Sequence, residues 1–126
     1  MAAVTTSTSR ALIVTGRGIR SLKHQRGKQL GQIAIRQSRY KKYSRRWKRL
    51  QRARHKVCKR AERHIRDQSH KATRYVIDFC AENEVGTLFI GNPQGVRHQD
   101  KGRHHNQRMA QWEYGTDIDY LTHKAT

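Results

Sequence analysis

Acidic side chains are missing from the first half of this chain. The first Asp or Glu is Glu62, and residues 1–60 hold 19 Lys+Arg without a single acid. The remaining residues hold nine basic and nine acidic side chains, so the net charge of +19 belongs to the N-terminal half. A block of this kind packs poorly against itself and concentrates near polyphosphates by counterion release. A nucleic acid, an anionic membrane surface or an acidic protein could bind this charge, and we expect nucleic acid.

Long apolar runs and paired cysteines are also scarce. No stretch approaches the roughly 18 apolar residues of a membrane-spanning helix, and the N-terminus lacks the order of a secretory signal. Hydrophobic residues make up 34% of the chain and aromatics 7%, which argues against a large independent core. Cys58 and Cys80 are too far apart along one expected helix to form a disulfide. We expect a cytoplasmic protein with reduced cysteines and no membrane partner.

Short β-branched runs and one helical stretch open the chain. Residues 2–6 and 11–15 are apolar runs separated by a polar linker, which predicts a β-hairpin. After the glycines at 16 and 18, Ser21 is placed to cap a helix that carries Leu22, Leu30 and Ile33. That helix is expected to be weakened by its glycines.

A second, longer helix follows a corner at residues 38–44. Ser44 is placed to cap it, and its apolar positions from Trp47 to Phe79 recur mostly at gaps of 3, 4 or 7, which form one stripe. The two basic helices predict an αα-hairpin. Residues 85–90 then have the length and composition of a third strand, and a last helix is expected from about Gln107, with Gly115 as a point where it kinks.

The basic stretch of the second helix is the strongest candidate site. Residues 39–60 contain 12 Lys+Arg in 22 positions, interleaved with Tyr40, Tyr43 and Trp47. Arginine matches phosphate with a planar fork, and aromatic rings stack on unpaired bases, although Trp47 fits a core position better. Nothing in the pattern distinguishes RNA from DNA. We expect nucleic acid to be bound by Arg39, Lys41, Lys42, Arg45, Arg46, Lys48, Arg49, Arg52, Arg54 and Lys56.

Residues for metal or small-molecule chemistry do not form a pattern. His98, His104 and His105 share a loop with Asp100, but the spacing of a four-ligand zinc site is absent. Asp117 and Asp119 are two residues apart on a helix and cannot face one point, so spacing alone assembles no nuclease site. A Gly-rich phosphate loop is also missing. We expect this chain to have no small-molecule substrate and no metal site of its own.

Several short motifs in a fixed order carry a resemblance to a known family. They are Gly16-Arg17-Gly18-Ile19-Arg20, Ser44-Arg45-Arg46-Trp47-Lys48-Arg49-Leu50, Ala72 to Phe79, Val85 to Asn92, Gly95-Val96-Arg97, His105-Asn106-Gln107 and Gln111-Trp112. Together they resemble the central part of the OrfB/TnpB proteins of insertion sequences, relatives of type V CRISPR effectors, over nearly the whole chain. Such proteins are RuvC-like nucleases with a guide RNA, a DNA target and Mg²⁺.

The resemblance implies an α/β chain with a partial RNase H-like (RuvC) fold, about three strands and a long basic α-helical hairpin as an insertion. It divides the chain into the N-terminal β-hairpin of the RuvC-like core at 1–18, the basic helical hairpin at 19–82, and a strand, loop and helix at 83–126. Both DNA and RNA are the implied partners, and Mg²⁺ is the cofactor of the complete family protein.

The carboxylates of that family are incomplete here. The resemblance implies that the first precedes the segment matching Ala2-Ala3-Val4, that the third lies past Thr126, and that the middle one corresponds to Gly91, as in one branch of the family. We hypothesise that Glu113 is the displaced metal ligand, and a solvated helix acid is the equal alternative. In a complete relative, Glu113→Gln should abolish cleavage and spare binding, whereas normal cleavage would reject the hypothesis.

The leading interpretation is a nucleic-acid-binding fragment of an OrfB/TnpB protein, linked to DNA transposition and recombination and not catalytic alone. Whether the chain acts as an enzyme stays open. One alternative is a standalone basic repressor or accessory protein that binds RNA or DNA on the same scaffold. Another is an unrelated small basic protein of ribosomal type, which charge and size allow.

Overall fold

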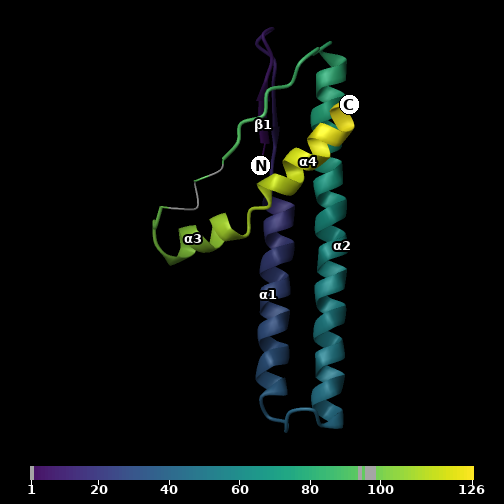
Figure 1. Cartoon of the computed structure of the whole chain (residues 1–126), viewed down its shortest axis with the longest axis vertical. Coiled ribbons are helices and arrows are strands. Elements are labelled where there is room, and N and C mark those ends of the chain that lie inside the picture. The colour runs from purple at the N-terminus through teal and green to yellow at the C-terminus, as the bar shows by residue number, and fades with distance from the viewer. Residues whose placement is uncertain (1, 94, 96–98) are drawn as a thin grey trace. The chain divides into compact units, whose positions relative to one another are not determined.

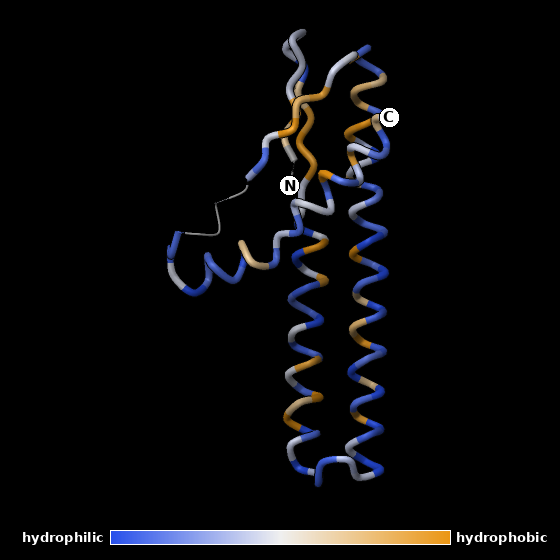
Figure 2. The backbone as a smooth tube through the Cα atoms, viewed as in Figure 1, coloured by the Kyte–Doolittle hydropathy of each residue, from blue (hydrophilic) through white to orange (hydrophobic). Residues whose placement is uncertain are grey.

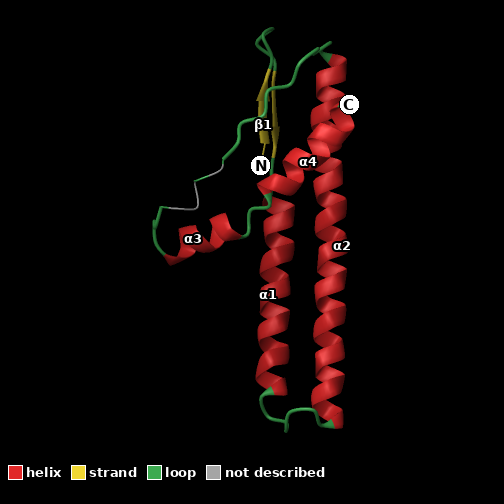
Figure 3. Ribbon diagram, viewed as in Figure 1, coloured by secondary structure: helices red, strands yellow, loops and turns green. Residues whose placement is uncertain are grey.

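The computed structural model describes residues 2–93, 95 and 99–126 as a mixed α/β chain that is mostly helical (Figures 1 and 3). Two compact units make up the chain. Met1–Val14 and His70–Thr126 form the first, called here the sheet unit, and Thr15–Ser69 form the second, called here the hairpin unit. The expected α/β class is confirmed at this level, with a two-stranded sheet and long helices.

The sheet unit begins with the predicted β-hairpin, which is confirmed. Strands β1 (Ala2–Thr5) and β2 (Ala11–Val14) pair antiparallel, with Val4 opposite Leu12. The backbone N–H of Thr6 donates to the carbonyl of Arg10 at 2.9 Å and continues the ladder into the turn. Ser9 closes that turn with a φ of 63°, a left-handed conformation that a small polar side chain tolerates.

The core of the sheet unit is small and lies on one face of the β-hairpin. Its buried members are Val76 and Cys80 of helix α2 (Arg45–Glu82) and Leu121 of helix α4 (Tyr114–Ala125). Val4, Leu12 and Val14 pack against them because alternate strand residues point to the same face. The strands and the chain after α2 are correspondingly the most apolar segments of this unit (Figure 2).

The predicted third strand at residues 85–90 is wrong. Among the described residues the sheet has two strands, β1 and β2, and residues 85–90 are irregular. Val85 and Leu88 do pack against the core, but the backbone N–H of Val85 donates to Cys80 at the end of α2. Phe89 is 91% exposed. Apolar composition thus placed this segment on the core, whereas a strand also needs a partner backbone.

The predicted last helix is two helices. Helix α3 (Arg103–Ala110) ends before residues 111–113, and α4 begins at Tyr114. Gly115 lies inside α4, so the expected kink at Gly115 is wrong as well. Lys124 fastens α4 to α2, because its Nζ donates to the carbonyl of His70 at 2.6 Å and to Thr73 Oγ1 at 2.7 Å. The rings of His70 and Tyr120 stack beside it at 4.1 Å.

The hairpin unit contains helix α1 (Arg17–Gln37) and the part of α2 up to Ser69. The expected cap at Ser21 is wrong, since α1 starts one turn earlier, after Gly16, without a side-chain cap. The expected cap at Ser44 is confirmed: its Oγ accepts the backbone N–H of Trp47 at 3.3 Å. Gln37 then ties the helices together by donating to Gln51 Oε1 at 3.0 Å.

The seam of the hairpin unit is thin. Leu22, Leu30 and Ile33 of α1 and Leu50 and Val57 of α2 are only half-buried. Gaps of eight and three residues in α1 and of seven in α2 keep each set on one side of its helix, and the rest of both helices is mostly hydrophilic (Figure 2). Polar side chains therefore occupy much of the surface between and around these apolar positions.

Candidate nucleic-acid interface

Aromatic and cationic side chains meet in the turn of the hairpin unit. Tyr43 has a φ of 67°, and its ring lies 5.3 Å from that of Trp47. Lys42 Nζ sits 5.2 Å from the Tyr43 ring centre, and the Arg46 guanidinium lies 5.7 Å from the ring of Tyr40. Tyr43 is 64% exposed, whereas Trp47 is half-buried. The turn thus offers open aromatic faces surrounded by cations.

All ten cations predicted to bind nucleic acid lie in the hairpin unit and are exposed: Arg39, Lys41, Lys42, Arg45, Arg46, Lys48, Arg49, Arg52, Arg54 and Lys56. The unit as a whole has 20 Lys+Arg against two acids, Glu62 and Asp67. Exposed cations with so few acids beside them keep their charge available to a polyanion. Their role in binding remains a prediction.

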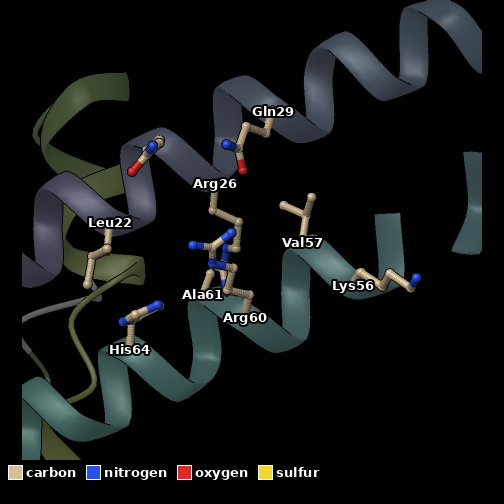
Figure 4. Close-up of a pocket in the computed structure, with 9 residues that line it drawn as sticks. Leu22, Arg26, Gln29, Lys56, Val57, Arg60, Ala61 and His64 are labelled. Carbon is tan, nitrogen blue, oxygen red and sulfur yellow. The ribbon is translucent and has the colours of Figure 1, made fainter. Parts of the chain in front are cut away.

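A cleft between α1 and α2 contains two cations, Arg26 and Arg60, that are not among the ten predicted above. It has a volume of about 360 Å³ and is also lined by His64 and the predicted Lys56 (Figure 4). A signal for Arg26 was present, because it lies four residues after Leu22 and four before Leu30. This spacing puts an arginine on the apolar face of α1, where it is half-buried.

The residues for metal chemistry are not brought together. No group of three or more His, Cys, Asp or Glu side chains positioned for a metal ion occurs within residues 2–93, 95 and 99–126. Glu113 precedes α4 as its N-cap residue and is exposed, and Gly91 carries no ligand atom. A single carboxylate cannot hold the two metal ions of a nuclease site. The hypothesis that Glu113 replaces a displaced acid stays a prediction.

Asp100 has a structural role in the loop before α3. Asp100 Oδ1 accepts the backbone N–H of Gly102 at 2.9 Å and the Asn106 side-chain amide at 2.7 Å. These two hydrogen bonds, chiefly the one from Gly102, lower the pKa of Asp100 below its ordinary value of 3.8. Gly102 has a φ of 89°, which suits glycine. His98 lies outside the described residues, so the loop as a whole is not assigned.

None of the described helices is long and apolar enough to cross a membrane.

Comparison with known proteins identifies one matching family. The family model OrfB_IS605, described as "Probable transposase", matches residues 1–97, and no curated protein or solved structure matches the chain. This match covers the β-hairpin, the hairpin unit and the segment after α2. It rules out the alternative that the chain is an unrelated small basic protein of ribosomal type. The chain therefore belongs to the OrfB_IS605 family of probable transposases.

Proposed function

We propose that the chain binds nucleic acid through its hairpin unit, as the nucleic-acid-handling part of a transposase-related protein. The observation that carries this proposal is the separation of charge: 20 Lys+Arg against two acids in Thr15–Ser69. Membership of a transposase family supports the same role. Phosphate contacts supply sequence-independent affinity, and the exposed tyrosines of the turn supply stacking surfaces for bases.

Fluorescence anisotropy over a range of salt tests the proposal. The whole protein is titrated against structured RNA, single-stranded DNA and duplex DNA of equal length. Affinity should fall linearly with the logarithm of salt concentration, because each neutralised phosphate releases about 0.7–0.9 counterions. Tighter binding of RNA than of DNA would favour a guide-binding role. Weak binding to all three, independent of salt, would reject the proposal.

A matched pair of variants locates the binding surface. The first replaces Arg45, Arg49 and Arg52 of the hairpin unit with Gln, and the second replaces Lys101, Arg103 and Arg108 of the sheet unit. Both lose three charges. The first should reduce the salt slope by about 2–3 and weaken binding on the order of tenfold or more, and the second should change it far less. Equal effects would show that net charge, not the hairpin unit, governs binding.

We also propose that the sheet unit is part of an RNase H-like sheet. The β-hairpin with its apolar face on α2 and α4 supports this assignment. An experimental structure of a longer family member is expected to have β1 and β2 as neighbours in a larger sheet. A sheet of two strands there would reject it.

A further inference from the structure

The cleft between α1 and α2 combines cations with two kinds of side chain that a purely electrostatic surface does not need. Cations lie among three apolar side chains, Leu22, Val57 and Ala61, and the amides of Gln25 and Gln29 line the α1 side. Figure 4 shows Arg26 extending from α1 toward Ala61 and Arg60 of α2. All of these residues belong to the hairpin unit.

The charge of the cleft calls for an anion. No carboxylate lines it, and within the described part of the chain none of Arg26, Lys56 and Arg60 has an ion pair. Arg26 is half-buried, so its charge is partly removed from water while a second guanidinium faces the same space. Like charges in such a place raise each other's energy, and a phosphate matches guanidinium geometry with paired hydrogen bonds.

The apolar side chains of the cleft indicate a ligand that has an apolar part as well as a phosphate. Phosphate gains nothing from Leu22 or Val57, whereas the flat face of a base buries apolar area against them. The small side chain of Ala61 leaves room for such a ring, and the Gln25 and Gln29 amides can donate to and accept from a base edge. A volume of about 360 Å³ lies near the lower end of the range of about 300–1,000 Å³ for small-ligand sites.

Base pairing decides which nucleic acids can use this cleft. In a duplex the base faces are stacked on one another, so only phosphates and groove edges reach the protein. A bulged, looped or terminal nucleotide can instead leave the stack and enter a protein site. The apolar side chains inside the cleft therefore favour an unpaired nucleotide over a paired one.

We propose that the α1–α2 cleft is a binding site for one unpaired nucleotide, with its phosphate on Arg26 and Arg60 and its base against Leu22, Val57 and Ala61. The inference rests on nucleic-acid binding by the hairpin unit and adds a site that discriminates unpaired from paired residues. RNA and DNA share the chemistry that the cleft uses.

Three oligonucleotides of one sequence test the site: a perfect duplex, the same duplex with a one-nucleotide bulge, and the bulged duplex with an abasic residue in the bulge. The whole protein should bind the bulged duplex about tenfold more tightly than the other two, the order of magnitude expected when one base face is buried against apolar side chains. RNA and DNA versions are run in parallel. A preference in RNA alone assigns the cleft to a ribonucleotide, and a preference in both assigns recognition to the base and phosphate.

Variants with matched controls separate the cleft from the rest of the surface. Ala61→Phe fills the cleft without changing charge and should erase the preference while keeping affinity for the perfect duplex. His55→Phe adds the same ring at an exposed position of α2 that does not line the cleft, and should keep the preference. Arg60→Gln should weaken the preference for the bulged duplex, whereas Arg54→Gln should lower the affinity for all three duplexes equally.

A measurement on the unmodified protein guards against misfolding of the Phe variant. The methyl resonances of Leu22 and Val57 should shift on addition of the bulged duplex and stay in place with the abasic one. Equal affinity for all three duplexes without these shifts would overturn the site and leave the proposed function standing. Absence of binding to every oligonucleotide would overturn both.

Discussion

The sheet unit and the hairpin unit differ in both charge and chain connectivity. The hairpin unit is one continuous segment with 20 Lys+Arg against two acids, whereas the sheet unit joins two distant segments with eight Lys+Arg against seven acids. Among the residues that the structure describes, three of the four buried apolar ones, Val76, Cys80 and Leu121, belong to the sheet unit. Folding stability and nucleic-acid affinity are therefore expected to depend on different parts of the molecule.

The largest effect is expected from Leu121→Ala. This buried side chain joins α4 to Val76 and Cys80 of α2, and its truncation should cost about 3 kcal/mol of unfolding free energy. Hydrogen exchange should show lost protection in α4 and the β-hairpin, with residues 17–37 unchanged. Leu50→Ala, at a half-buried position of the hairpin unit, is the control and should cost less. A larger loss from Leu50→Ala would invert the comparison.

A smaller loss is expected from Lys124→Met. The variant keeps the aliphatic stem but removes the ammonium that donates to His70 and Thr73, and hydrogen bonds from a charged group contribute about 1.5–3 kcal/mol. Denaturant unfolding followed by circular dichroism measures the change. Lys101→Met removes an exposed lysine from the same unit, and its stability should stay within the error of the method. Equal stabilities of the two variants would mean that the Lys124 bonds contribute nothing net.

In the hairpin unit the thin seam leaves room for stabilisation. A Cβ at Gly27 or Gly31 meets nothing within 4 Å, and each replacement of a helical Gly by Ala is expected to add about 1 kcal/mol. The double variant should melt at a higher temperature with unchanged affinity for nucleic acid. If affinity falls as α1 becomes more stable, helix flexibility belongs to the binding mechanism and the two properties are coupled after all.

The smallest effect is expected at Asp100, which is exposed. Its pKa is lowered in the folded loop by the bonds from Gly102 and Asn106, so their contribution is present above the ordinary pKa and is lost as pH falls through the lowered one. The amide resonance of Gly102 should titrate with a midpoint below 3.8. Asp100→Ala should remove this titration and loosen the start of α3. A midpoint at or above 3.8 would contradict the hydrogen-bonded loop.

Local signals in the sequence were sufficient for much of the architecture. The β-hairpin follows from two β-branched runs and a polar linker, and the start of α2 follows from the hydroxyl of Ser44 before a periodic stretch. The charge of the future hairpin unit could be read directly from the absence of acids before Glu62. Each of these features depends on residues close together in the chain.

Features that depend on distant residues were not predictable in the same way. Residues 85–90 look like a strand, but pairing requires a neighbour that composition does not provide. The break at residues 111–113 separates α3 from α4, and it lies before the glycine that seemed the natural breaking point. The cleft was missed because Arg26 and Arg60 face each other only after two helices have paired.

The order of the first turn of α2 is expected to depend on ionic strength. Arg45, Arg46 and Lys48 occupy this turn without an acid, although the start of a helix carries partial positive charge. Added salt screens this repulsion and should make the free turn more ordered, while the same salt weakens binding of a polyanion. A bound polyanion should in turn order the start of α2 by mass action. Ionic strength thus has opposite effects on the folding of this turn and on its binding.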